Sequence, residues 1–246
     1  MSKTIFITGA SSGLGLENET ELSQLENITL LPLDVTDLDQ VKETANKAIE
    51  IGVDVVFNNA GYALMGSMEA SSDEKIVRQI DTNILGVMRV TKAFIPYFRE
   101  RKSGLFISTT SVGGIWGFPL SAVYNATKFA VEGWSESISF ELGQFGIGIK
   151  TVAPGLMLTD FTGRSLDMNS LPEYQDVESK VFGSFEGANK SASTAEQIAE
   201  VVYEAVTDGK DQIRYVAGED AKEQYERRLK IGNEAFRQDM HKGIFG

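Results

Sequence analysis

Two patterns of apolar residues alternate along the chain. Short runs of about four to eight nearly continuous apolar residues are typical of strands buried on both faces of a parallel sheet. Longer stretches, in which apolar residues recur every three or four positions, are typical of helices. Their alternation predicts an α/β fold, a doubly wound, Rossmann-like parallel sheet covered by helices. The predicted strands span residues 3–8, 28–35, 53–57, 104–110, 147–153 and 213–216.

Helix-start signals support the predicted helices. Thr194 and Gln197 have the spacing of a capping box, in which each side chain bonds the other residue's backbone. Thr36 stands where a second helix needs an N-cap, and acidic residues follow it. The predicted helices span residues 36–51, 72–101, 120–145 and 194–207, the second of them broken near residues 83–86 or bent at Pro96.

The chain of 246 residues shows no internal repeat and no low-complexity linker, so we expect a single domain over residues 1–246. Two regions differ from the rest. Residues 156–193 are polar, rich in Gly and Ser and weakly periodic, which indicates a substrate lid within the domain. Residues 218–246 form a charged, helical tail, whose simplest interpretation is a solvated helix pair closing one edge.

Composition excludes several kinds of chemistry. The chain has no Cys and one His, His241, which argues against thiolate nucleophiles, cysteine metal sites and a central His base, and no metal is predicted. Tyr, Lys, Asp and Glu remain as general acids and bases. A net charge of −12 disfavours nucleic acid as a partner. No apolar run approaches the ~18–20 residues of a membrane span, and the first residues lack a signal peptide's apolar region. We therefore expect a cytoplasmic protein without membrane contact.

A glycine-rich turn, TGASSGLG at residues 8–15, directly follows the first predicted strand. Its glycines let the backbone turn sharply and let a pyrophosphate approach the N–H groups of a following helix. A simple tight turn is one alternative. A second is a hydrolase elbow of the form G-x-S-x-G with Ser11 as nucleophile, which would need His241 as its only base.

The segment after this turn is unusually short. Only 14 residues separate Gly15 from Leu30, whereas a βαβ unit takes ~30 or more. Either the chain lacks the helix and second strand expected here, or the natural protein carries a further segment, which is our preferred interpretation. An intact mass of the natural protein a few kDa above 26.9 kDa would support it, and a mass of 26.9 kDa would exclude it.

Tyr124 and Lys128 are the strongest candidates for chemistry. They stand four residues apart in the predicted helix 120–145, so both can face one cleft. A lysine cation and a positively charged nicotinamide would favour the phenolate and lower the pKa of Tyr124 from its usual ~10. Ser111 follows a predicted strand, at the edge where open α/β sheets bind ligands. Asn83 interrupts a helical region with a side chain suited to local backbone bonding.

Taken together, these motifs resemble the short-chain dehydrogenase/reductase family, near its hydroxysteroid and retinol dehydrogenase-like members. They run in family order over nearly two-thirds of the chain, and the departure is the short segment after Gly15. The matching pieces are TG…GLG at residues 8–15, LDV at 33–35, NNAG at 58–61, Asn83, Ser111, Tyr124…Lys128 and PG…T at 154–159.

The resemblance implies a role for each catalytic candidate. Tyr124 would be the general acid and base, and Lys128 would lower its pKa and hold the nicotinamide ribose. Ser111 would orient the reacting oxygen, and Asn83 would anchor a water leading to Lys128.

The resemblance also implies a set of cofactor contacts. Alternatives remain open, because Asn58 also suits a plain turn and Asp34 could simply cap the helix 36–51. The implied contacts are Gly9, Ser11, Ser12, Gly13, Leu14 and Gly15 for the diphosphate side, Asp34 and Val35 for adenine, Asn58, Ala60 and Gly61 for ribose, Tyr124 and Lys128 for the nicotinamide ribose, and Pro154, Gly155 and Thr159 for the carboxamide.

The predicted function is NAD(P)-dependent interconversion of a hydrophobic secondary alcohol and a ketone or aldehyde. The choice between NAD and NADP stays open, because the second strand that normally decides it is absent from the sequence. Family members suggest a homodimer or homotetramer. The alternatives are a non-catalytic nucleotide-sensing or scaffold protein of the same fold, and a sugar-nucleotide epimerase or dehydratase, although little chain follows Pro154 for the larger substrate domain of the latter.

Overall fold

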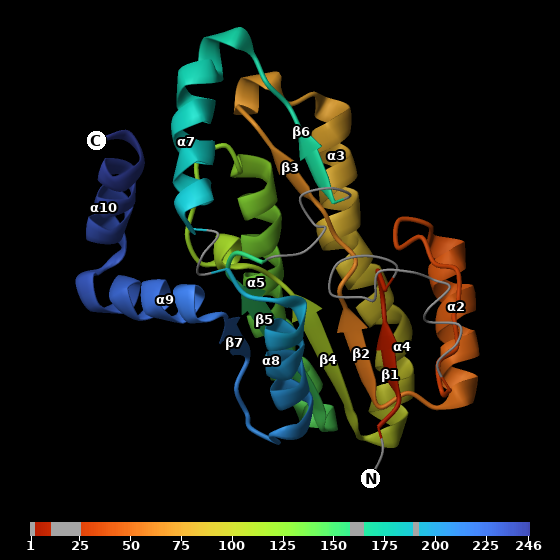
Figure 1. The fold of residues 1–246 in the computed structure, drawn as a ribbon. Coiled ribbons are helices and arrows are strands. Elements are labelled where there is room, and N and C mark those ends of the chain that lie inside the picture. Colours follow the sequence, from red (N-terminus) through yellow and green to blue (C-terminus); the bar gives the residue numbers. More distant parts are fainter. Residues whose placement is uncertain (1–2, 11–25, 158–164, 189–191) are drawn as a thin grey trace.

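A five-stranded parallel sheet forms the centre of the computed structural model, which describes residues 3–10, 26–157, 165–188 and 192–246 (Figure 1). The strand order is β1-β2-β4-β5-β7, and each neighbouring pair is parallel. This topology confirms the predicted doubly wound α/β class. The strands are β1 (Ile5–Ile7), β2 (Val55–Asn58), β4 (Gly104–Thr109), β5 (Ile147–Pro154) and β7 (Arg214–Ala217).

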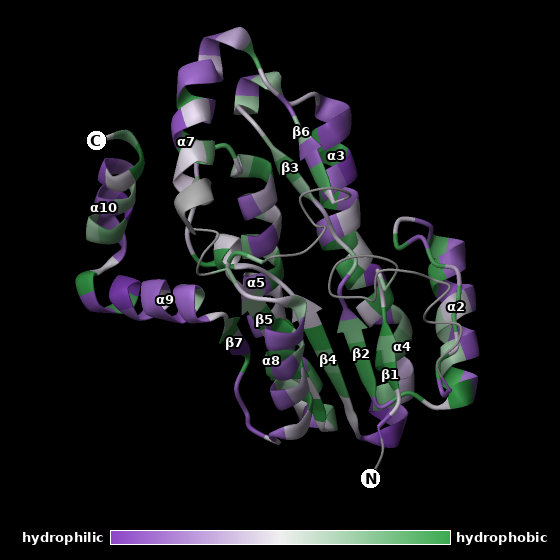
Figure 2. Ribbon diagram, viewed as in Figure 1, coloured by the Kyte–Doolittle hydropathy of each residue, from purple (hydrophilic) through white to green (hydrophobic). Residues whose placement is uncertain are grey.

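Helices cover both faces of this sheet. Alternate side chains of a strand point to opposite faces, so Val56 packs in the cluster shared with α2, α4 and α5, whereas Val55 and Phe57 pack in the cluster shared with α8. The central strands are accordingly hydrophobic along their length (Figure 2). The helices are α2 (Leu38–Ile51), α4 (Val87–Arg101), α5 (Ala122–Leu142) and α8 (Ala195–Thr207).

Further elements stand above the carboxyl ends of the sheet (Figure 1). Strand β3 (Ala63–Met65) pairs in parallel with β6 (Leu166–Met168). Helix α3 (Asp73–Ile80) continues through a π-helical turn, η2 (Asp81–Gly86), into α4. Helix α7 (Gln175–Ala188) lies in the stretch 156–193, so this weakly periodic stretch contains a regular helix. Short 3₁₀ turns span Met68–Ala70, Val112–Gly114, Gly143–Phe145 and Pro172–Tyr174.

The predicted tail is helical, with α9 (Glu219–Ile231) followed by α10 (Asn233–Phe245). It is more than a solvated pair, because Phe236 of α10 is 1% exposed and its ring centroid lies 5.4 Å from that of Trp116. The tail therefore completes an apolar cluster beside the loop that follows β4.

The prediction of a strand over residues 28–35 is wrong. None of these residues is assigned to a strand, and the described strand that pairs with β1 is β2. A strand needs a hydrogen-bonded neighbour, and none of the described strands pairs with residues 28–35. Ile28 and Leu30 are accordingly 41% and 42% exposed. The unusually short segment lies largely at residues 11–25, outside the described part.

Helix boundaries differ from the expectations in two places. The N-cap of α2 is Asp37 rather than Thr36, because the Asp37 carboxylate accepts from the backbone of Asp39 and Gln40. The expected break within residues 72–101 is the π-helical turn η2, which widens the helix without ending it. The capping box of Thr194 and Gln197 is confirmed at the start of α8.

Candidate active site

Threonines tie together the carboxyl ends of β1, β2 and β4. The Thr8 hydroxyl oxygen accepts from the backbone N–H groups of Asn59 and Ala60, each at 3.0 Å. The Thr109 hydroxyl donates to Oδ1 of Asn59 at 3.0 Å. Gly9 adopts a φ of +66°, and a Cβ on it would lie 2.7 Å from the Ala60 Cα. These bonds and this close approach fix the backbone that borders the sheet's ligand-binding edge.

The turn after β4 brings Ser111 to Tyr124. Ser111 caps the turn Val112–Gly114, where its Oγ accepts from the Gly113 N–H at 3.0 Å. A Cβ on Gly113 would lie 2.9 Å from Asn125 Oδ1, so glycine lets this turn lie against the first turn of α5. The same Cβ would lie 3.4 Å from Ser111 Oγ and 3.4 Å from Tyr124 Cε1, so the two side chains lie side by side. A hydroxyl pair suited to holding one substrate oxygen therefore forms at the end of β4.

Lys128 lies one turn further along α5 and is 7% exposed. Its Nζ donates to the Thr109 carbonyl at 2.9 Å and lies 5.7 Å from the centroid of the Tyr124 ring. Burial lowers the pKa of Lys128 to about 8, and the negative charge of Glu132 opposes this effect. The ammonium therefore titrates close to neutral pH, inside the site.

The pKa of Tyr124 differs from the sequence-based expectation. We expected the Lys128 cation to lower it. Within this chain burial raises the pKa of Tyr124, and the hydrogen bond from Ser111 is what opposes the rise. The physical reason is that desolvation of the phenolate outweighs the hydrogen bond, so the protein's own groups favour the protonated phenol.

Asn83 lies in η2 and is 1% exposed. Its Oδ1 accepts from the Tyr62 N–H at 3.1 Å, and its Nδ2 donates to the Tyr62 carbonyl at 2.9 Å and to Thr127 Oγ1 at 3.1 Å. The Asn83 carboxamide therefore joins the loop after β2 to α5 through its hydrogen bonds to both. Gly61 lies beside it, since a Cβ there would lie 3.2 Å from Asn83 Oδ1 and 3.8 Å from Lys128 Nζ.

Three other predicted cofactor residues point elsewhere. Asn58 is 2% exposed, and its Nδ2 donates to Thr91 Oγ1 of α4 at 2.9 Å, so its side chain faces the core. Asp34 Oδ1 accepts from the N–H and hydroxyl of Thr36 at 2.8 and 2.7 Å, a local turn contact that lies before the N-cap Asp37, so Asp34 does not cap α2 as the alternative interpretation had it. A Cβ on Gly86 would lie 2.7 Å from Val35 Cγ2, so Val35 packs against η2.

At the end of β5, Pro154 and Gly155 border the same edge. The Gly155 N–H donates to the Ala217 carbonyl at 2.9 Å, and a Cβ on Gly155 would lie 2.6 Å from Asp220 Oδ2. These residues are held by β7 and α9. The remaining predicted contacts lie outside the described residues; they are Ser11, Ser12, Gly13, Leu14, Gly15 and Thr159.

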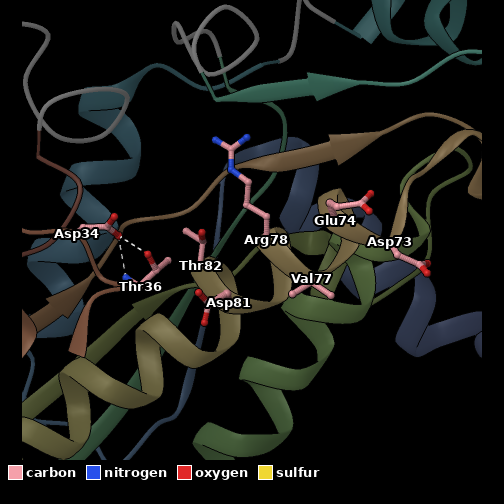
Figure 3. A pocket seen from close by; sticks show the side chains of 8 residues that line it. All are labelled: Asp34, Thr36, Asp73, Glu74, Val77, Arg78, Asp81 and Thr82. Carbon is pink, nitrogen blue, oxygen red and sulfur yellow. Dashed lines mark hydrogen bonds between the residues drawn. The ribbon is translucent and has the colours of Figure 1, made fainter. Parts of the chain in front are cut away.

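A hollow of about 680 Å³ opens between the loop after residue 33 and helix α3 (Figure 3). Arg78 extends over it, with its guanidinium 5.2 Å from the centre of the Tyr62 ring. The lining is otherwise mostly acidic. It consists of Asp34, Thr36, Asp73, Glu74, Val77, Arg78, Asp81 and Thr82.

The parallel sheet and the converging Ser, Tyr and Lys side chains define an oxidoreductase class, that of NAD(P)-dependent α/β enzymes. A family model described as short chain dehydrogenase matches residues 17–170, and the chain belongs to this family. The family predicted from the motifs is therefore confirmed, as are its enzymatic class and its use of NAD or NADP.

Known proteins agree with this assignment. An uncharacterised oxidoreductase of Schizosaccharomyces pombe is 34% identical over 222 residues, covering 89% of this chain and 94% of its own. Retinol dehydrogenase 8 of Bos taurus is 32% identical over 212 residues, covering 74% and 68%. The structure of ElxO with NADP bound superposes with a TM-score of 0.72 at 27% identity, covering 88% and 97%. The predicted likeness to retinol dehydrogenase-like members is confirmed.

Sequence reasoning missed four residues that shape the site. Thr8 follows the last residue of β1 and Thr109 is the last residue of β4, and a threonine at a strand's carboxyl end was the available signal. Thr127 partners Asn83. Glu132 stands four residues after Lys128, on the same helix face, and that spacing was a signal for it too.

No helix in the described part of the chain combines the length and the apolar character needed to cross a membrane.

Proposed function

We propose that this protein interconverts a hydrophobic secondary alcohol and the corresponding ketone or aldehyde, with Tyr124 as the acid and base. The observation that carries the proposal is the convergence of Ser111, Tyr124 and the buried Lys128. A Cβ on Gly113 would lie 3.4 Å from both Ser111 Oγ and Tyr124 Cε1, and Lys128 Nζ lies 5.7 Å from the centroid of the Tyr124 ring. Two hydroxyls and one ammonium then meet where a reacting oxygen can be held and protonated.

In the direction of reduction, Tyr124 Oη gives its proton to the carbonyl oxygen of the substrate. The raised pKa of Tyr124 keeps that proton in place until the oxygen becomes basic. Ser111 Oγ donates a second hydrogen bond to the same oxygen and orients it. The Lys128 ammonium, anchored on the Thr109 carbonyl, stabilises the phenolate that remains. Oxidation runs through the same groups in reverse. A bound nicotinamide supplies the hydride in reduction and takes it up in oxidation.

The described residues fit a dinucleotide along the sheet's carboxyl edge. The positive φ of Gly9 and its contact with Ala60 leave bare backbone where a diphosphate would lie, and Gly61 gives access to Lys128. We propose that Lys128 holds the nicotinamide ribose, and that Asn83 acts through its backbone, because its side chain is already paired. Either NAD or NADP is compatible with this arrangement. The other proposed contacts are Ser11, Ser12, Gly13, Leu14, Gly15, Asp34, Val35, Asn58, Pro154, Gly155 and Thr159.

Residues 156–193 are the proposed substrate lid. The two ends of the stretch meet, since the Ser193 N–H donates to the Leu156 carbonyl at 2.9 Å and Met157 bridges Ser193. Its strand β6 pairs with β3 above the sheet's carboxyl end. A segment that leaves and rejoins the fold at one place beside the catalytic groups can cover a substrate. The likeness to a retinol dehydrogenase supports an apolar substrate.

The proposal includes a homodimer or homotetramer located in the cytoplasm. Phe129 and Phe140 lie on one face of α5 and are 44% and 72% exposed, and Gly133 between them has open space around its Cα. Large exposed aromatic side chains in one stripe favour burial against another subunit. Light scattering of the purified protein tests the assembly, and a monomer at micromolar concentration would contradict it.

Titration with NADH and with NADPH separates the enzyme from the scaffold alternative. We expect at least one reduced cofactor to bind, with its fluorescence enhanced in the cleft, and to be oxidised when a panel of apolar ketones and aldehydes is added. Failure to bind either cofactor would favour a non-catalytic protein of this fold.

A further inference from the structure

Glu132 is a buried carboxylate that the proposed reaction does not use. It lies on α5, one turn after Lys128, and is 3% exposed. A buried carboxylate is stable only when hydrogen bonds and opposite charge replace its water. Three side chains provide them, one from the residue that follows β4, one from β5 and one from β7. Thr110 Oγ1 donates to Oε1 at 2.5 Å, while Thr151 Oγ1 and Arg214 Nε donate to Oε2 at 3.2 and 2.8 Å.

These bonds connect Glu132 to the catalytic groups. Thr110 stands between Thr109, whose carbonyl accepts from Lys128, and Ser111, which lies beside Tyr124. The turn after Ser111 also packs on this part of α5, because a Cβ on Gly114 would lie 2.8 Å from the Lys128 carbonyl oxygen and 3.1 Å from Glu132 Cγ. The carboxylate therefore fixes the strand end bearing Ser111 against the helix bearing Tyr124 and Lys128.

Charge provides a second link. In the described structure, few groups near Lys128 can balance the positive charge of its ammonium. Tyr124 and Glu132 face it from α5, the Thr109 carbonyl from β4 and the Asn83 carboxamide from η2. Of these, Glu132 is the one with a full negative charge, and Arg214 of β7 partly neutralises it through their ion pair.

We propose that Glu132 is a positioning residue of the active site, which holds the Ser111 turn on α5 and keeps Lys128 charged, with Arg214 setting the strength of that effect. The inference about catalysis rests on the function proposed above, whereas the coupling between Glu132 and Lys128 can be measured without turnover.

The test compares Glu132→Gln with Arg214→Gln, because both variants break the same ion pair. A purely structural ion pair predicts the same damage from either change. The proposed coupling predicts opposite shifts in the pKa of Lys128. Glu132→Gln removes the anion and should lower it by about one unit, whereas Arg214→Gln removes the cation and should raise it by about half a unit.

The measurement is an NMR titration of the protein labelled with ¹³C at the lysine Cε, with the Lys128 signal assigned by its loss in Lys128→Arg. Glu136→Gln is the matched control, since it removes one carboxylate from the exposed face of α5 a turn further on. We expect no shift in that variant. Shifts of the same sign in the two test variants, or none, would overturn the proposal.

A second readout addresses positioning. In carbonyl reduction, activity should fall as Lys128 loses its proton, so the descending limb of kcat/KM should lie near pH 8 and move down in Glu132→Gln but up in Arg214→Gln. If Glu132→Gln does not fold, Arg214→Gln and Arg214→Lys, which keeps the positive charge, decide the question. The pKa of Lys128 should stay near its original value in Arg214→Lys. An unchanged pKa of Lys128 in Arg214→Gln would refute the coupling. Absence of turnover in the unaltered protein would contradict the proposed function, while the NMR titration would still test Glu132.

Discussion

The Tyr124→Phe variant is expected to lose about a thousandfold in kcat for carbonyl reduction, while its affinity for the reduced cofactor stays within severalfold of the original. The change removes one oxygen atom, and with it the proton that would reach the substrate. The ring still packs at the start of α5, so the variant should fold. Steady-state kinetics and cofactor titration measure the two quantities separately.

Tyr203→Phe is the matched control, because it makes the same change on an α8 side chain that is 70% exposed. Its activity should equal that of the unaltered protein. Normal turnover in Tyr124→Phe would refute the proton-transfer role, and a large loss of cofactor affinity would show that Tyr124 acts mainly in binding.

Lys128→Met should damage both binding and rate. Methionine preserves most of the buried volume but leaves the Thr109 carbonyl without its 2.9 Å donor and removes the ammonium beside Tyr124. A lost hydrogen bond to a charged group costs about 1.5–3 kcal/mol, so we expect cofactor affinity to fall at least about tenfold and kcat to fall further.

Lys92→Met, on the exposed face of α4, controls for the loss of a positive charge. Cofactor affinity that is unchanged in Lys128→Met would contradict the proposed ribose contact. A lower kcat with unchanged affinity would leave Lys128 as a partner of Tyr124 alone.

Strands buried on both faces were the most predictable part of the fold. The apolar runs that became β2, β4 and β5 needed no knowledge of their neighbours, since their side chains are buried on either face. Residues 28–35 have a similar composition, yet no strand forms there. A strand depends on its hydrogen-bonding neighbour as well as on its own residues, and that dependence is not visible in a local pattern.

The catalytic grouping was predictable for a different reason. The spacing of Tyr124 and Lys128 fixes their common helix face, and Ser111 follows a recognisable strand. Which atoms they meet was not predictable. The Thr109 carbonyl that holds Lys128 and the carboxylate of Glu132 become neighbours only when α5 packs against the ends of β4 and β5. Burial, which raises the pKa of Tyr124 against expectation, also follows from that packing.

Transfer of isotope from cofactor to substrate tests the central claim most directly. The protein is incubated with NADH or NADPH carrying deuterium at nicotinamide C4, one stereoisomer at a time, together with an apolar ketone that it reduces. The account predicts an alcohol with one deuterium on the former carbonyl carbon, from one face of the nicotinamide only, and a proton from solvent on its oxygen. An alcohol without deuterium from both stereoisomers, or no alcohol with either cofactor across the ketone and aldehyde panel, would contradict it.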